Sequence, residues 1–157
     1  LRLYDIDCNG GLWVGKEYAH GNAYQRDPLH KLSHGASVYQ VARFFYMLEE
    51  GGLVDAEYRD DMKEILSKPG IEHKFVVGLR DRPVDEMFRK SGTWLDYHAD
   101  AALVASGGHR FIMVGLAHHP RGGKWLSSLA APLFDLVVCP AGKTAGKTPA
   151  VVPEGAD

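Results

Sequence analysis

The sequence predicts an α/β fold of the α+β kind, in which an antiparallel sheet of about three strands packs against a C-terminal helix and follows two other helices. Apolar residues recur at helical spacing over two early segments and one late segment. Between these segments lie three short apolar runs separated by turn-forming residues. The length of 157 residues, 45% of them hydrophobic and 24% charged, suits one globular domain with a single core.

The first 37 residues are rich in Gly, Asn, His and Tyr and show no sustained period. This composition predicts an irregular region with a short strand at Leu12–Val14. Long irregular segments in compact domains often contribute to binding sites. Trp13, Tyr18 and Tyr24 are therefore candidates to line a cleft, although packing beneath a loop explains such aromatic residues equally well.

Two helices are predicted next. Ser37 is a suitable N-cap and Gln40 completes a capping-box pattern, while a Gly pair at 51–52 stops the helix. The second helix begins near Asp55 and ends before the Pro-Gly pair at 69–70. The apolar positions of the two helices are Val38, Val41, Ala42, Phe45 and Leu48, then Tyr58, Met62, Ile65 and Leu66.

Three strands are predicted at residues 87–91, 101–105 and 110–116. The turn residues expected between the first two strands are Asp96, His98 and Asp100, and those between the last two are Ser106, Gly107 and Gly108. The Ser-Gly-Gly connection is short enough for a hairpin, so these two strands should pair antiparallel.

A final helix is predicted over residues 123–137, where Pro132 should kink or split it. After Cys139 the chain is rich in Pro, Gly and Ala, which predicts a domain over residues 1–139 and a flexible tail over 140–157. The tail holds two Gly-Lys-Thr triplets. A phosphate-binding loop is excluded because only three residues separate Gly142 from Gly146 and no helix follows.

The formal charge of −2 gives no attraction to nucleic acid or to an anionic membrane. No apolar run approaches the roughly 18–20 residues needed to span a bilayer. Cys8 and Cys139 are the two cysteines, and without a spacing motif they are more often unpaired thiols, so their pairing stays open.

Eight histidines raise the possibility of a metal-dependent hydrolase. His30 and His34 have helical spacing, but a neighbouring Pro and Gly disfavour a helix there. The adjacent His118 and His119 would point to opposite faces of a strand. We therefore expect no metal and no cofactor, and keep the metal-dependent hydrolase as an alternative.

The most informative tetrapeptide is Lys-Ser-Gly-Thr at residues 90–93, at the end of a predicted strand and before Trp94. The tetrapeptide resembles the Lys-Thr/Ser-Gly motif of penicillin-recognising serine enzymes, which implies that Lys90 places positive potential near a proton-transfer network and a substrate carboxylate. Small hydroxyl residues such as Ser91 and Thr93 can bind that carboxylate, and Gly92 lets a substrate backbone approach the strand closely. A strand that ends in a surface turn could give the same tetrapeptide.

This tetrapeptide and the order of elements around it resemble the C-terminal part of the penicillin-binding-protein and class A β-lactamase family, in which a Lys-Thr/Ser-Gly motif lies on a sheet-edge strand beside the nucleophile. The resemblance extends over roughly residues 11–137, through the stretches 33–37 with 41–43, 48–54 and 100–104. It implies serine-hydrolase acyl transfer on a small-molecule or peptide-like substrate. It also implies a catalytic Lys90, a substrate-binding group of Ser91, Gly92, Thr93 and Trp94, and access shaped by Asp96 or His98.

The chain departs from the family pattern in its nucleophile. The family uses a Ser-x-x-Lys serine, and no serine here has a lysine three residues later; the serines are Ser33, Ser37, Ser67, Ser91, Ser106, Ser127 and Ser128. A Ser-Asp-Asn element is also absent, with Asp-Cys-Asn at residues 7–9 as the nearest sequence, and Glu17 lies too far upstream to be the deacylating glutamate.

Three strands alone leave an open sheet edge. We therefore expect a missing N-terminal segment or a partner chain to complete the sheet, and this chain alone to be inactive. A non-catalytic ligand-binding or sensor domain of the same fold is the alternative. Family members are commonly exported, which favours a periplasmic or secreted protein.

Overall fold

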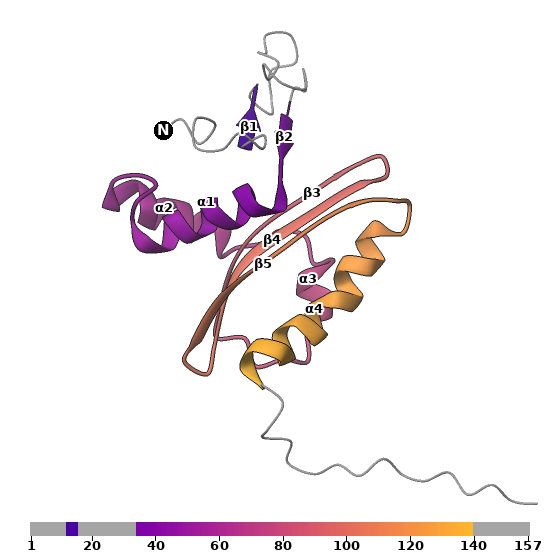
Figure 1. The fold of residues 1–157 in the computed structure, drawn as a ribbon. Coiled ribbons are helices and arrows are strands. Elements are labelled where there is room, and N and C mark those ends of the chain that lie inside the picture. The colour runs from indigo at the N-terminus through magenta and orange to yellow at the C-terminus, as the bar shows by residue number, and fades with distance from the viewer. Residues whose placement is uncertain (1–11, 16–33, 140–157) are drawn as a thin grey trace, which may run out of the picture.

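The computed structural model describes residues 12–15 and 34–139. Figure 1 shows two short strands, then helices, then a sheet followed by a long helix. The elements are β1 (Leu12–Val14), β2 (His34–Ala36), α1 (Val38–Glu50), α2 (Ala56–Leu66), α3 (Phe75–Gly78), β3 (Glu86–Trp94), β4 (Tyr97–Ser106), β5 (His109–His118) and α4 (Gly122–Val138).

The main sheet has three antiparallel strands in the order β3-β4-β5. In its register Ser91 lies opposite Asp100 and Thr93 lies opposite His98. Among the described strands, β3 has a neighbour on one side only, so its other side is a sheet edge. The Lys-Ser-Gly-Thr sequence therefore lies on an edge strand of the described sheet.

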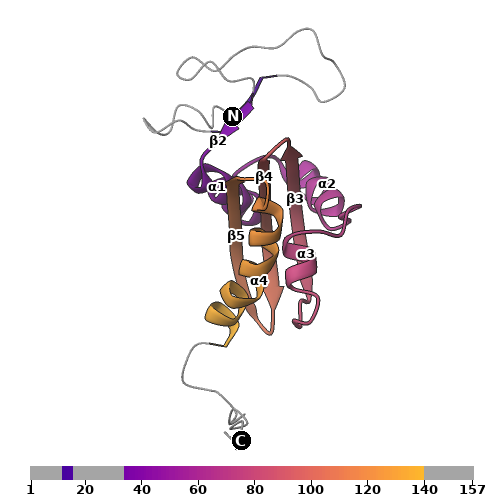
Figure 2. The same cartoon turned by 90° about the vertical axis from the view of Figure 1, so that its right-hand side faces the viewer.

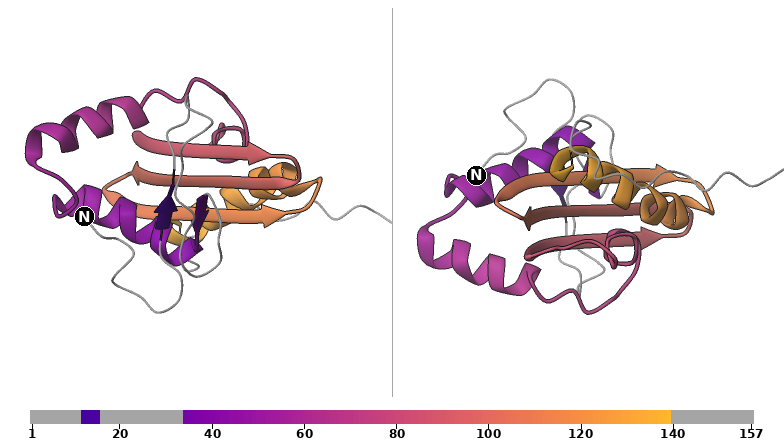
Figure 3. Two further views of the ribbon diagram at one scale, coloured as in Figure 1. Left: turned by 90° about the horizontal axis from the view of Figure 1, so that it is seen from above. Right: turned by 90° about the horizontal axis from the view of Figure 1, so that it is seen from below.

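A helical layer covers each face of the sheet. Seen from above, α1 crosses in front of the strands, and seen from below, α4 does (Figure 3). The core between the sheet and the pair α3 and α4 is built from Phe75, Leu79, Ala102, Val104, Met113, Leu126, Ala130 and Phe134. A smaller core on the α1 face contains Phe45, Ala101 and Leu103. Alternation along β4 sends successive residues to opposite cores, as a strand buried on both faces requires.

The N-cap and the glycine stop predicted for α1 are confirmed. The Ser37 side chain accepts a hydrogen bond from Gln40 N at 3.2 Å, which satisfies one free donor at the start of α1. Gly51 ends the same helix with a φ of 79°, a left-handed conformation that favours glycine. The Ser-Gly-Gly hairpin is also confirmed, with Gly107 and Gly108 at positive φ between β4 and β5.

The predicted turn between the first two long strands is wrong in its extent. His98 and Asp100 belong to β4, and only Leu95 and Asp96 separate β3 from β4. Leu95 adopts a φ of 49°, so a two-residue connection suffices without a glycine. Asp100 was predicted to lie in the turn because aspartate is common in turns. The sequence does not show that a buried cation compensates the charge of Asp100 inside the sheet.

Three other differences concern single elements. The short strand at Leu12–Val14 is confirmed, but its partner β2 lies in the stretch predicted to be irregular. The one-turn helix α3 was not predicted. The helix α4 continues through Pro132 as one element instead of splitting. Cys139 is exposed at the end of α4, whereas Cys8 and residues 140–157 lie outside the described residues, so the disulfide and the tail stay untested.

Candidate active site

The Lys-Ser-Gly-Thr sequence occupies the second half of the edge strand β3 (Figure 2). Successive side chains of a strand point to opposite faces. Ser91 and Thr93 lie on the same face as Arg89, toward α3 and α4, and Lys90 lies on the α1 face opposite Ala101. The four residues therefore do not form one cluster, because the strand divides them between two surfaces.

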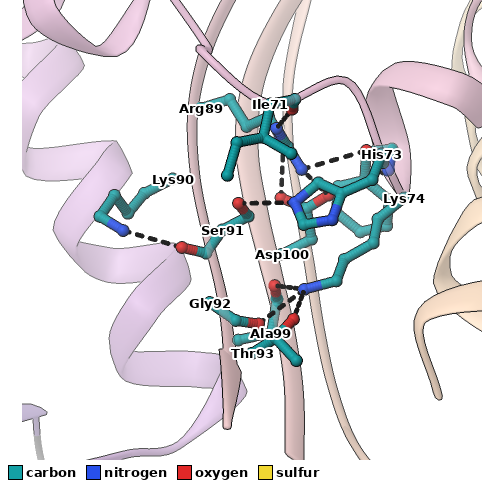
Figure 4. Close-up of polar contacts among 11 residues, drawn as sticks. Ile71, His73, Lys74, Arg89, Lys90, Ser91, Gly92, Thr93, Ala99 and Asp100 are labelled. Atoms are coloured by element: carbon teal, nitrogen blue, oxygen red, sulfur yellow. Dashed lines mark hydrogen bonds and ion pairs between the residues drawn. The ribbon is translucent and has the colours of Figure 1, made fainter.

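Lys90 is exposed and its ammonium group donates a hydrogen bond to its neighbour's backbone, Ser91 O, at 2.7 Å. Its side chain points away from the loop that contacts the two hydroxyl groups (Figure 4). Lys90 is thus the cation of the α1 face of β3. Its catalytic role, implied by the family resemblance, stays a prediction.

The hydroxyl groups of Ser91 and Thr93 are held by two consecutive residues of the loop before α3. His73 Nε2 lies 3.0 Å from Ser91 Oγ. Lys74 Nζ donates to Thr93 Oγ1 at 2.9 Å, and also to the carbonyl oxygens of Gly92 at 2.6 Å and Ala99 at 2.9 Å (Figure 4). One loop thereby contacts both hydroxyl residues and the glycine between them.

Lys74 is unusual in two respects. It is only 4% exposed, and its φ of 51° places the backbone in a region that non-glycine residues rarely adopt. Burial lowers the pKa of the Lys74 ammonium below its ordinary value, while the nearby Asp100 carboxylate opposes this shift. Buried lysines need full hydrogen bonding, and here three oxygen atoms accept from the three N–H groups.

The loop is anchored by an ion pair inside the sheet. The side chains of Arg89 and Asp100 are 2% and 0% exposed, and two hydrogen bonds of 2.8 and 3.0 Å join them. Arg89 also donates to the carbonyl oxygens of Ile71 and His73 at 2.8 and 3.1 Å. Asp100 accepts from Phe75 N at 2.9 Å. The pair therefore fixes the backbone on both sides of Lys74.

The pKa of His73 is lowered chiefly by burial of the ring and then by the positive charges of Lys74 and Arg89, against an opposing contribution from Asp100. The lowered pKa favours the uncharged form of the ring. A neutral imidazole can either accept the Ser91 proton or donate to Ser91 Oγ, depending on its tautomer.

Apolar side chains are exposed around the β3–β4 turn. Trp94, Leu95 and Tyr97 are 74%, 76% and 54% exposed. Trp94 is the last residue of β3, and its place beside a cleft stays a prediction. Asp96 lies in the turn itself. His98 packs at the start of α4, and its two ring nitrogens are buried without a hydrogen-bond partner among the described residues.

Four residues of this site were not predicted from the sequence, namely His73, Lys74, Arg89 and Asp100. Arg89 interrupts an apolar strand pattern, and Asp100 comes directly before an apolar run. Opposite charges at two such positions could have suggested a buried pair. No sequence signal distinguishes Lys74 from a surface lysine, since its burial depends on the path of the loop.

The histidines do not gather into a metal site in the described part of the chain. No group of three or more His, Cys, Asp or Glu residues there could hold a metal ion. His118 stacks on Tyr97 and His119 stacks on Trp125, with ring centroids 3.9 and 4.2 Å apart. His30 lies outside the described residues. None of the described helices is long and apolar enough to cross a membrane.

The arrangement of the sheet and its covering helices is shared with solved structures of low sequence identity. The structure of PBP-A superposes with a TM-score of 0.57 at 17% identity, over 73% of this chain and 46% of that chain. A β-lactamase from Sphaerobacter thermophilus DSM 20745 gives a TM-score of 0.56 at 14% identity, over 74% and 46%. A PBP-A mutant in an acyl-enzyme complex with penicillin G gives 0.53 at 16% identity, over 65% and 41%.

The family is established by sequence. The profile of the β-lactamase enzyme family matches residues 17–136, and the chain therefore belongs to that family. No curated protein matches the chain in a sequence search. The chain spans less than half the length of the solved structures it resembles.

Proposed function

We propose that this chain is part of a serine hydrolase of the β-lactamase and D-Ala-D-Ala-peptidase type, and that it supplies the substrate-binding wall of the active site. The observation that carries this proposal is the pair of hydroxyl groups on one face of an edge strand, Ser91 and Thr93, each hydrogen-bonded to the loop behind it. Membership of the β-lactamase family supports the reaction class.

In the proposed reaction a serine oxygen attacks the carbonyl carbon of a β-lactam, peptide or ester. The bond from that carbon to the leaving nitrogen or oxygen breaks, and the leaving atom takes up a proton. Water then cleaves the acyl-enzyme and restores the serine. No Ser-x-x-Lys serine occurs among the 157 residues, so this mechanism needs the nucleophile from outside this sequence.

The chain's own residues would bind and orient the substrate. Hydroxyl hydrogens from Ser91 and Thr93 can donate to a substrate carboxylate, and an acylation site gains rate from such fixed orientation. At Gly92 the strand has no side chain, so a substrate can lie close to its edge. Lys90, exposed on the α1 face, would contribute positive potential from the other side of the strand.

A second candidate is a ligand-binding or sensor domain that has the same substrate-binding strand but no catalytic activity. An upstream coding segment with a Ser-x-x-Lys serine would favour the hydrolase, and the lack of such a segment would favour the binding domain. Both candidate functions involve the same class of ligand. In both, residues 1–139 form the proposed domain. On family membership we further propose a periplasmic or secreted location and a segment or partner that completes the sheet.

The test is a titration of the 157-residue chain with penicillin G and with penicillin G methyl ester, followed by amide chemical shifts and intact mass. The proposal predicts shifts centred on residues 90–94 with the acid, much weaker shifts with the ester, and no mass increase. Shifts elsewhere, or equal binding of acid and ester, would contradict the carboxylate wall. A covalent adduct would show that a nucleophile lies within this sequence.

A further inference from the structure

We infer that the end of the sheet formed by the β3–β4 turn and the start of α4 docks on the surface of an anionic lipid bilayer. Its apolar side chains would enter the bilayer interface, and its basic side chains would lie against lipid phosphates. This inference goes beyond the proposed function and does not rest on it. We call this part of the molecule the docking end, and its exposed residues are Trp94, Leu95, Tyr97, Arg121, Lys124 and Trp125.

The docking end brings together two segments that are distant in the sequence. His119 N donates to Asp96 O at 2.8 Å, which joins the connection between β5 and α4 to the β3–β4 turn. The His119 ring stacks on Trp125, with ring centroids 4.2 Å apart, and the Arg121 guanidinium lies 5.9 Å from the centroid of the same indole. Figures 1 and 2 show the turn and the start of α4 at the same end of the sheet. The two segments therefore present their side chains at one place on the molecule.

The β3–β4 turn contains a residue that folding alone does not explain. Leu95 has a φ of 49°, a conformation for which hairpin turns favour glycine or asparagine, and it is 76% exposed. The β4–β5 hairpin at the other end of the sheet has Gly107 and Gly108 at its positive φ positions. Leu95 thus costs backbone energy without burying its side chain within the described chain. Contact with an external apolar phase explains why a leucine stands there.

Aromatic side chains flank Leu95 on both strands. Trp94 and Tyr97 lie opposite each other in the register and are 74% and 54% exposed. On α4, Trp125 is 42% exposed and adds a second indole. Tryptophan and tyrosine favour the membrane interface, because the ring enters the apolar region while its polar group stays hydrated. The composition of the docking end is therefore that of an interfacial membrane contact.

Basic side chains at the same end favour an anionic lipid surface over an apolar groove of a protein. Arg121 and Lys124 are exposed at the first turn of α4, which contains no acidic residue. Cations at a helix N-terminus oppose the helix dipole, so this is where they stabilise α4 least. Lys90 is exposed on the same face of β3 as Trp94, and Asp96 in the turn offsets one of these charges. The whole chain has a formal charge of −2, so the basic excess belongs to this end.

The experiment is sedimentation of the 157-residue chain with two kinds of vesicle, an equimolar mixture of phosphatidylcholine and phosphatidylglycerol, and phosphatidylcholine alone. The chain should bind the mixed vesicles about tenfold more strongly, because each basic residue near an anionic surface contributes to binding. Tryptophan emission should shift to shorter wavelength on binding, as the indoles of Trp94 and Trp125 enter the interface.

Leu95→Asn is the decisive variant. It should bind the mixed vesicles about tenfold more weakly, because the apolar contact of the leucine is lost; this factor corresponds to about 1.4 kcal/mol. Its thermal midpoint should stay unchanged or rise, since asparagine tolerates a positive φ better than leucine. Weaker binding without a loss of stability separates docking from a role in folding.

Lys124→Gln tests the charge independently of the turn. It should weaken binding to the mixed vesicles about fivefold, the factor that corresponds to about 1 kcal/mol, and leave binding to phosphatidylcholine unchanged. If Leu95→Asn fails to fold, this variant decides, because Lys124 is exposed on the surface of α4. Leu136→Gln is the matched control: Leu136 is 71% exposed near the other end of α4, and its replacement should leave binding to both vesicles unchanged.

Failure of the unmodified chain to bind the mixed vesicles would overturn the inference, and so would equal binding to both kinds of vesicle. Equal losses for Leu95→Asn and Leu136→Gln would assign the binding to exposed apolar surface in general, against a specific docking end. A dimer of the chain in solution that Leu95→Asn dissociates, without vesicle binding, would assign the same residues to a protein contact and contradict the inference.

Discussion

The two faces of the edge strand β3 are organised differently. On the face toward α3 and α4, Arg89 is buried in an ion pair and the hydroxyl groups of Ser91 and Thr93 are both hydrogen-bonded. On the α1 face, Lys90 is exposed and Trp94 is 74% exposed. On the first face an ion pair and hydrogen bonds from other segments hold the polar side chains, whereas on the α1 face the Lys90 ammonium donates to the backbone of its own neighbour, Ser91 O.

This difference indicates how the strand could serve a binding site. Groups that recognise a ligand bind more tightly when their orientation is set before the ligand arrives. The loop at residues 71–75 provides this for the hydroxyl face. Among the described residues no loop holds Lys90 on the α1 face in this way, and its ammonium group donates to Ser91 O.

The largest expected effect comes from the ion pair beneath the hydroxyl face. Asp100→Asn leaves the Arg89 guanidinium buried without a counter-charge, and breaking such a pair costs about 3–5 kcal/mol. Urea unfolding should show this loss. It should also release the loop, and amide hydrogen exchange at residues 71–75 should rise more than in the rest of the chain.

The control for that change is Asp135→Asn. Asp135 forms two hydrogen bonds with Arg82, at 2.7 and 2.6 Å, but the two side chains are 44% and 31% exposed. Exposed pairs contribute about 0–1 kcal/mol. Equal losses for the two variants would mean that burial of the Arg89–Asp100 pair does not matter.

A smaller effect should appear in the pH dependence of stability. The pKa of His73 is lowered in the folded chain, so protonation favours the unfolded state. The His73 contribution is complete above the unfolded pKa of about 6.5 and is lost as the pH falls below it toward the folded value. His73→Gln lacks this contribution.

The free energy of unfolding should therefore fall more steeply between pH 7.5 and 5 in the unmodified chain than in His73→Gln. Parallel curves for the two proteins would contradict the lowered pKa.

Much of the fold followed from local sequence patterns. Ser37 and Gly51 marked the ends of α1, and the Ser-Gly-Gly hairpin marked the join of β4 and β5, because caps and tight turns depend on a few adjacent residues. The position of the motif on a strand end was also predictable. These features need no knowledge of distant contacts.

The support of the site was not predictable in the same way. Lys74 and Thr93 are 19 positions apart, and Arg89 and Asp100 meet only because the β3–β4 register and the loop path bring them together. Asp100 was assigned to a turn because an aspartate inside a strand is unfavourable without a partner. Its partner is identified only once the strand register is known.

The most direct test of the account is the effect of Gly92→Ala on penicillin G affinity. A Cβ at this position would lie 3.9 Å from Ala99 Cβ, an ordinary contact, so the thermal midpoint should stay unchanged. If a substrate lies along the edge of β3, the added methyl group should weaken binding about tenfold, which corresponds to about 1.4 kcal/mol. Unchanged affinity in a fully folded variant would contradict the claim that this strand edge is the substrate-binding wall.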